Sequence, residues 1–261
     1  MLGAIAGDII GSVYERRHIK VTDFPLFSDG SRFTDDSVLT AAVAEALLQG
    51  RSYEESLRDF YRRYPRAGYG YLFGAWGRGE ITEPYQSFGN GSAMRVSPVA
   101  YVHDSLDAVL AEAEASARVT HDHPDGLAGA RAVAAAIFLA RAGKDKAEIK
   151  AYLAENSSYD LDQSLEAIRP DYRFDATCPG SVGEAILAFL ESTDFESALR
   201  LAVSLGGDAD TQAAIAGSIA EAYYQGIPEE IETEVFARLD ARLGGVARSF
   251  RERYLAGGYR I

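Results

Sequence analysis

The sequence predicts an all-α protein, a compact orthogonal multi-helix bundle. Small and apolar residues recur with helical spacing over much of the chain, as at Leu127, Val133, Ile137 and Leu139. No stretch shows the sustained alternation of a half-buried strand. The chain has 261 residues and is 47% hydrophobic, which is ample for a large core. No repeat of 20–50 residues is evident, so a solenoid is not expected.

The amino-acid composition limits the number of domains to be expected and the classes of partner that the protein can bind. No Pro/Gly/Ser-rich linker and no run of like charges divides the chain, so residues 1–261 are expected to form a single domain. The net charge of −13 disfavours binding to nucleic-acid backbones or anionic membranes. A phosphate-bearing substrate would therefore need help from local cations or helix N-termini.

Three features favour a cytoplasmic protein. Cys178 is the only cysteine, so no internal disulfide is possible. The N-terminal stretch lacks the basic region of a signal peptide, and residues 132–140, the longest apolar run, are too few to cross a bilayer. The sequence leaves the oligomeric state open.

Residues 2–14 predict a first helix that is buried at the centre of the fold. Gly3, Gly7 and Gly11 are spaced by four residues, so they line one helix face and allow another backbone to approach closely. Asp8 lies in the same helix and must be paired or hydrogen-bonded if it is buried. We expect it to support the site structurally.

The positions of the remaining elements are predicted from the periodicity of apolar residues and from residues that begin or end helices. Residues 15–33 lack helical spacing and predict a loop long enough to be a lid. Helices are expected at 35–49 and from Ser52 to Tyr64, followed by mixed short helix and loop over 68–84. A glycine turn then leads into residues 96–102. Further helices are expected at about 105–119, 125–142, 145–155, 179–191, 194–204, 211–225 and 228–255, with an irregular segment at 159–177.

Two acidic clusters, Thr34-Asp35-Asp36 and Asp208-Ala209-Asp210-Thr211, precede predicted helices. Hard divalent cations prefer several oxygen ligands, which two carboxylates and a hydroxyl supply. Helix capping is the alternative, because Asp and Thr accept the free N–H groups at a helix start. A cap needs only one acceptor, and adjacent acids repel each other unless a cation lies between them. Spacing alone leaves both interpretations open.

A glycine turn at Gly89-Asn90-Gly91-Ser92 could present N–H groups and a hydroxyl to an anion. By itself, however, the pattern is more typical of an ordinary tight turn, because Asn-Gly is a common one. Phe88, just before it, could stack an aromatic base or simply pack.

Two further polar residues lie where predicted elements meet. His121 is interpreted as a hydrogen-bond donor in a site rather than a metal ligand, and its neighbour His123 as a surface residue. Glu15 begins the predicted lid, where it could be a ligand, a general base or a solvated side chain.

Five motifs together resemble those of the ADP-ribosylglycohydrolase family, and they occur in that family's order between residue 3 and about residue 225. They are Gly7-Asp8-x-x-Gly11-x-x-Tyr14-Glu15, Phe33-Thr34-Asp35-Asp36, Gly89-Asn90-Gly91-Ser92-Ala93-Met94-Arg95, Thr120-His121 and Gly207-Asp208-Ala209-Asp210-Thr211. One departure is Ser37, where many relatives have another threonine; serine keeps the hydroxyl.

The resemblance implies an all-α fold of ADP-ribosylglycohydrolase type with two divalent ions, Mg²⁺ or Mn²⁺, in a central cleft. It assigns Thr34, Asp35 and Asp36 to one side of the ion pair, and Asp208, Asp210 and Thr211 to the other. Glu15 matches a glutamate on a mobile loop that touches one ion and takes part in catalysis. The positions matching those that hold the ADP part of the ligand are Phe88, Gly89, Asn90, Gly91, Ser92 and His121.

The activity implied is metal-dependent hydrolysis of the glycosidic bond between ADP-ribose and an acceptor, a protein side chain or a small molecule. Glu15, or one of the carboxylates Asp35 and Asp36, would act as the general base. Two alternatives are a non-catalytic ADP-ribose-binding or structural protein on the same scaffold, and a metal-dependent nucleotide phosphohydrolase.

Overall fold

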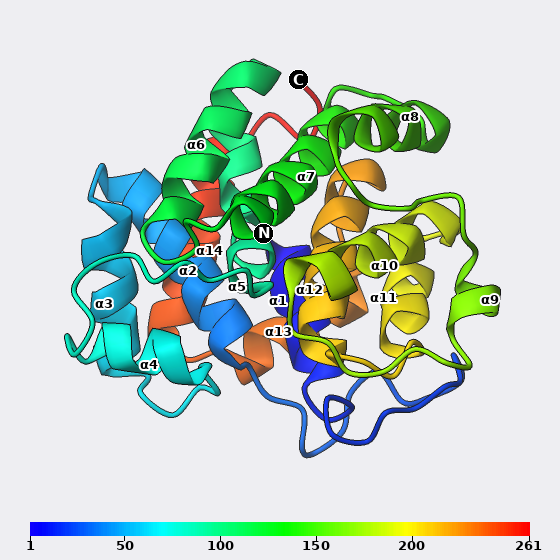
Figure 1. The fold of residues 1–261 in the computed structure, drawn as a ribbon, viewed down its shortest axis with the longest axis horizontal. Helices are drawn as coiled ribbons and strands as arrows, with labels where there is room; N and C mark the ends of the chain where they lie inside the picture. Colours follow the sequence, from blue (N-terminus) through cyan, green and yellow to red (C-terminus); the bar gives the residue numbers. More distant parts are fainter.

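The computed structural model describes residues 1–261, which form fourteen α-helices, one 3₁₀ helix and no β-sheet (Figure 1). The only strand-like pairing is an isolated antiparallel bridge between Gly89 and Thr177. The predicted all-α fold class is therefore confirmed. No helix combines the length and the apolar character needed to cross a membrane.

The helices are, in chain order, α1 (Leu2–Gly11), α2 (Asp35–Gln49), α3 (Tyr53–Arg63), α4 (Tyr71–Gly77), α5 (Gly91–Met94), η1 (Ser97–Tyr101), α6 (Leu106–Arg118), α7 (Pro124–Arg141), α8 (Lys146–Asn156), α9 (Leu165–Ile168), α10 (Cys178–Glu191), α11 (Phe195–Val203), α12 (Ala209–Tyr223), α13 (Glu229–Arg238) and α14 (Ala241–Tyr254).

Most predicted helix ends agree with these bounds to within a few residues, and one prediction is wrong. Residues 228–255, expected to be one helix, form α13 and α14. The break arises because the Asp240 carboxylate accepts the N–H groups of Arg242 and Leu243 and so caps a new helix. The first helix ends at Gly11 rather than at residue 14. The segment 159–177 is irregular except for the single turn of α9.

Helix α1 lies at the centre of the molecule, and all ten of its residues are buried. It lies beside α12 (Figure 1). Its glycine face contacts that helix directly, as the predicted close backbone approach requires. A β-carbon on Gly3 would lie 2.2 Å from the carbonyl oxygen of Gly217, and one on Gly11 would lie 2.4 Å from that of Ala209. The two backbones therefore touch without intervening side chains, which fixes the C-terminal end of α1 against the N-terminal end of α12.

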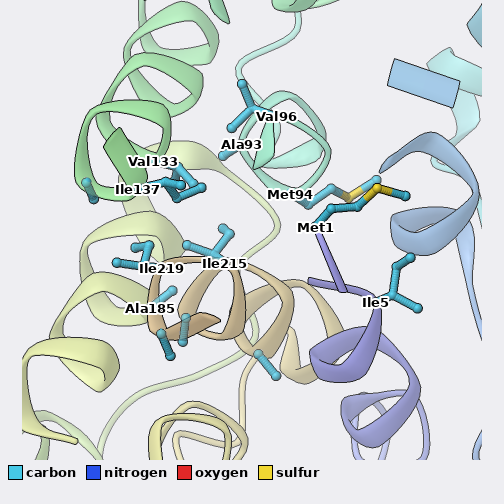
Figure 2. Packing of buried hydrophobic residues seen from close by; sticks show 14 of the residues in the cluster. Met1, Ile5, Ala93, Met94, Val96, Val133, Ile137, Ala185, Ile215 and Ile219 are labelled. Carbon is cyan, nitrogen blue, oxygen red and sulfur yellow. The ribbon is translucent and has the colours of Figure 1, made fainter. Parts of the chain in front are cut away.

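The hydrophobic core is built around these two helices. Helix α12 also packs on α7, α10 and α11. Figure 2 shows Val133 and Ile137 of α7 facing Ile215 and Ile219 of α12, with Ala185 of α10 beside them. One connected cluster of buried residues extends from α1 to α14. The acidic helix starts are thus held on a closely packed, apolar base.

Replacing Gly7 by alanine tests the contact between α1 and α12. The added β-carbon would lie 2.1 Å from the Ala213 carbonyl oxygen and 2.5 Å from the Ala214 nitrogen, so the helices must separate. We expect Gly7→Ala to lower the free energy of unfolding by about 3 kcal/mol or more in urea denaturation. The matched control is Gly245→Ala in α14, where nothing lies within 4 Å of the new carbon. That change should stabilise the protein by about 0.5–1 kcal/mol. Equal effects of the two substitutions would contradict this packing.

Candidate metal centre and ligand cleft

Asp8 of α1 holds the start of α2. Its carboxylate accepts hydrogen bonds from the Thr34 N–H at 2.9 Å, the Thr34 hydroxyl at 2.6 Å and the Ser37 N–H at 3.0 Å, and the Ser37 hydroxyl donates a fourth. The expectation that a buried Asp8 must be hydrogen-bonded is therefore correct. Ser37, the position that departs from the family pattern, uses its hydroxyl in this contact. Asp8 thus places the Thr34-Asp35-Asp36 cluster.

The second cluster is placed by α1 and by the glycine turn. A β-carbon on Gly11 would lie 2.5 Å from the Asp210 α-carbon, so the start of α12 lies against the end of α1. The Asn90 side-chain amide donates to Asp208 at 2.8 Å. The Thr211 hydroxyl donates to Asp36 at 3.4 Å, which joins two clusters that are 175 residues apart. The structure therefore brings both acidic clusters together.

Capping engages few of these carboxylate oxygens; among the four acids, Asp210 accepts the Thr211 N–H at 3.0 Å. Thr34, not an aspartate, is the N-cap of α2, and Asp208 makes no side-chain capping bond at the start of α12. One Asp36 carboxylate oxygen is buried without any hydrogen-bond partner. A buried carboxylate oxygen left in this way is costly unless another partner, such as a cation, approaches it.

The carboxylates form two overlapping groups, each with ligand atoms within 4.8 Å of one another. Asp8, Asp36 and Asp210 form one group, and Glu15, Asp208 and Asp210 form the other. Asp210 belongs to both groups. Asp35 is outside these groups but lines the same cleft. This set of oxygen donors fits hard divalent cations.

No lysine or arginine forms an ion pair with any of these acids. Burial, and then the negative charge of Asp8, raises the pKa of Asp35 from its ordinary value of 3.8 to about 8. Burial raises the pKa values of Asp36 and Asp210 well above that ordinary value, and neighbouring aspartates raise them further. Burial also raises the pKa of Asp208. Divalent cations would favour the ionised forms of all four.

A cleft of about 410 Å³ opens beside the acids. Its walls contain Glu15, Asp35, Asp36, Asp208, Asp210 and Thr211 from the acidic side, and Gly89, Asn90, Gly91 and His121 from the glycine turn and the connection between α6 and α7. Two of the residues predicted to hold the ADP part of the ligand do not line this cleft. Phe88 is half exposed, with its ring against His123, and the Ser92 hydroxyl is buried and donates to the Gly126 carbonyl. Thr34 also lies behind the wall, donating to Asp8.

The glycine turn is held by the segment before α10. The Asn90 N–H donates to the Ala176 carbonyl and the Cys178 N–H to the Phe88 carbonyl, both at 2.9 Å. Asn90 also donates to Asp208, so one residue joins the predicted anion-binding turn to the acidic clusters. Glu15 is half-buried and reaches the acids from the loop after α1. That loop is fastened further along, where Lys20 donates to the Tyr172 carbonyl at 2.8 Å.

The two neighbouring histidines differ in environment. His121 is 5% exposed and lines the cleft, whereas His123 caps α7 and is partly exposed. Burial lowers the pKa of His121 well below its ordinary value, and the charge of Arg95 lowers it further. This low pKa favours the neutral form of the His121 imidazole over the cation.

Several cleft residues were not identified from the sequence. Tyr71 and Phe174 line the opening and are exposed, while Tyr85 and Arg95 lie in the wall near His121. Arg95 is fully buried, an unusual environment for arginine. The only sequence feature that distinguishes Arg95 is its position as the last residue of the glycine motif. The burial of a single arginine depends on tertiary packing and leaves no local pattern.

The fold and this site define a class, a helical protein whose buried carboxylates border a ligand cleft and suit divalent cations. The sequence model of the ADP-ribosylglycohydrolase family matches residues 1–256. The chain therefore belongs to the ADP-ribosylglycohydrolase family, which confirms the resemblance and the expectation of an enzyme.

Relatives and a solved structure agree with this assignment. The ADP-ribosylhydrolase ARH3 of Mus musculus is 27% identical over 97% of this chain and 91% of its own length. The ADP-ribosylarginine hydrolase Tri1 of Pseudomonas putida is 27% identical over 88% of this chain and 71% of its own length. A solved structure, described as an ADP-ribosylglycohydrolase-related protein complex, shares the fold with a TM-score of 0.68 and 24% identity, over 97% of this chain and 96% of its own.

The raised pKa values predict how the stability of the metal-free protein depends on pH. A carboxyl whose pKa is higher in the folded than in the unfolded chain binds more protons when folded, so its stabilising effect is lost as pH rises. For Asp35 the window runs from about pH 4 to about pH 8. We expect the melting temperature in chelator to fall by about 5 °C or more between pH 5.5 and pH 8. Mg²⁺ or Mn²⁺ should raise it more at pH 8 than at pH 5.5.

Asp36→Asn is the control for this pH dependence, because it removes one of the charges that repel each other. Its melting temperature should vary less with pH, and metal should raise it less. A wild-type protein that becomes more stable towards pH 8 without metal would contradict the charge distribution described above.

Proposed function

We propose that this protein hydrolyses the glycosidic bond between ADP-ribose and an acceptor, a protein side chain or a small molecule, and releases ADP-ribose. Family membership supports the reaction class. The observation that carries the proposal is the convergence of two acidic clusters, with Asp210 common to both groups, beside a cleft. Two divalent ions held there, Mg²⁺ or Mn²⁺, would bind ribose hydroxyl oxygens and orient a water molecule.

Each side of the proposed site has its own ligands. Asp35 and Asp36, with Thr34 behind them, would serve one ion, and Asp208, Asp210 and Thr211 the other. Asp8 would act mainly by holding α2, since four hydrogen bonds already engage its carboxylate.

Glu15 is the side chain proposed to move the proton. It lies within reach of Asp208 and Asp210 on a half-buried loop position, where it can accept a proton from the attacking water. Cleavage at the anomeric carbon develops positive charge on the sugar, and the surrounding carboxylates stabilise that charge. Asp35 and Asp36 share this electrostatic role.

The glycine turn is proposed to hold the ADP part of the ligand. Gly89, Asn90, Gly91 and His121 line the cleft. The N–H groups of Gly89 and Asn90 already donate to the Ser87 hydroxyl and the Ala176 carbonyl. The Gly91 N–H and the His121 ring are therefore the proposed donors to the diphosphate. Ser92 can contribute only its backbone, because its hydroxyl is engaged with Gly126. Phe88 would have to turn inward to stack the adenine.

Two other functions are distinguished by product analysis. Purified protein with each metal is incubated with arginine-, serine- and nucleotide-linked ADP-ribosyl substrates, and products are separated by chromatography. Free ADP-ribose supports the proposed reaction. Release of phosphate or AMP instead would indicate a nucleotide phosphohydrolase, and binding without turnover of any substrate would indicate a non-catalytic ADP-ribose-binding or structural protein.

Removing one acid from each cluster tests the ligand assignment. Asp36→Asn and Asp210→Asn should each lower kcat at least about 100-fold and weaken metal binding in calorimetry, because each loses a charged oxygen donor. Circular dichroism should show an intact fold. Glu155→Gln in α8, an exposed acid outside the cleft, is the matched control and should keep full activity. Full activity of either aspartate variant would refute the assignment.

Glu15 has a separate test. Glu15→Gln keeps the shape of the side chain but cannot accept the proton, so kcat should fall about 100-fold or more while the Kd for ADP-ribose stays within about threefold. Steady-state kinetics and calorimetry measure the two quantities. An unchanged kcat would remove Glu15 from the mechanism.

We further propose that residues 1–261 act as one domain in the cytoplasm. The single connected core supports the first statement, and the absence of paired cysteines supports the second.

A further inference from the structure

The wall of the cleft that carries His121 contains a buried cation with no acidic partner. Arg95 is fully buried, and its Nε and Nη1 atoms have no hydrogen-bond partner. Its Nη2 atom donates to the Ser116 carbonyl at 3.1 Å and to the Thr120 hydroxyl oxygen at 2.8 Å. A guanidinium buried without a carboxylate is costly, so this arrangement calls for a function.

Thr120 lies between that guanidinium and His121. Its hydroxyl oxygen is 2.7 Å from Nδ1 of His121, and the residue is completely buried. Arginine has only donors, so the Thr120 oxygen must accept from Arg95. The proton of the hydroxyl then needs an acceptor. Nδ1 of His121 is the only acceptor in hydrogen-bond geometry with it, and the Tyr85 hydroxyl is the other polar group near Thr120.

The direction of these bonds fixes the tautomer of the imidazole. If Nδ1 accepts a proton from Thr120, the hydrogen of the neutral ring must be on Nε2. Nε2 has no protein partner and lies at the glycine turn, where a β-carbon on Gly91 would be 3.1 Å from it. The series of hydrogen bonds from Arg95 through Thr120 to His121 therefore ends in an Nε2–H group beside the glycine turn.

We propose that Arg95 and Thr120 are positioning residues that hold His121 as an Nε2–H donor for an anionic group of the ligand. This inference rests on the proposed function, since it assigns that anion to the diphosphate of ADP-ribose. An Nδ1–H tautomer would instead turn a lone pair on Nε2 towards the anion, which repels it. The cation of Arg95, buried behind the ring, adds positive potential on the same side of the cleft.

Thr120→Val is the variant that tests the relay, because it keeps the shape of the side chain and removes the hydroxyl. Nitrogen-15 NMR of the imidazoles reports the tautomer directly. The spectrum of a His121→Gln variant identifies the His121 signals, and His18, His103 and His123 serve as internal references. Wild type should show His121 with hydrogen on Nε2 alone. In Thr120→Val a measurable Nδ1–H fraction should appear.

Ligand binding gives the second readout. The Kd for ADP-ribose, measured by calorimetry, should rise about tenfold in Thr120→Val and by a similar factor in His121→Gln. The double variant should bind ADP-ribose no more weakly than His121→Gln alone, because the two substitutions remove the same interaction. Thr120→Ser restores the hydroxyl and should return both the tautomer and the Kd to within about twofold of wild type.

Arg95→Met tests the first residue of this series of hydrogen bonds. It should also produce a mixed tautomer, because the Thr120 oxygen is then free to accept a hydrogen bond from Nδ1–H. If that variant does not fold, the Thr120 series still decides. A Thr120→Val protein with Nε2–H alone and unchanged affinity would overturn the inference. So would Thr120→Ser if it behaved like Thr120→Val, because the role would then be packing of the methyl group. A wild type that binds no ADP-ribose would defeat the proposed function, while the tautomer measurement would still test the relay.

Discussion

The direct backbone contact between α1 and α12 is the constraint on which the rest of this structure depends. Three glycines spaced by one helical turn remove the side chains that would otherwise separate the two helices. The contact sets the start of α12 against the end of α1, and Asp8, on the same turn of α1, holds the start of α2. One short buried helix therefore determines the relative positions of two acidic clusters that are far apart in the sequence.

The second determinant of the site is the concentration of negative charge in a buried place. Five carboxylates approach one another without a lysine or arginine, and burial raises the pKa values of Asp35, Asp36, Asp208 and Asp210. Such a cluster lowers the stability of the folded protein while no cation neutralises it. The opposite wall is arranged differently, with a neutral histidine and a buried guanidinium. The cleft thus has a carboxylate-rich side, which we propose binds cations, and an opposite side that we propose binds the anion.

Much of this could be predicted because the determinants are local. Helical periodicity gave the fold class, and the spacing of Gly3, Gly7 and Gly11 identified a close helix contact. The order of five motifs pointed to the family. Where the predictions were wrong or incomplete, the reason is competition between local signals or contacts made in three dimensions. Asp240 ends a predicted helix by capping the next one, and Ser92 gives its hydroxyl to Gly126 rather than to the cleft.

The sequence by itself determined which residue types are available: acids with hydroxyls at two helix starts, glycines for close approach, and a turn rich in N–H groups. These are properties of a few neighbouring residues and need no knowledge of the rest of the chain. Only the tertiary structure decided that Asp210 belongs to two clusters of acidic side chains. It also decided that Asn90 links the glycine turn to Asp208, and that Arg95 is buried behind His121. Each of these is a contact between distant segments, and packing of the whole core fixes it.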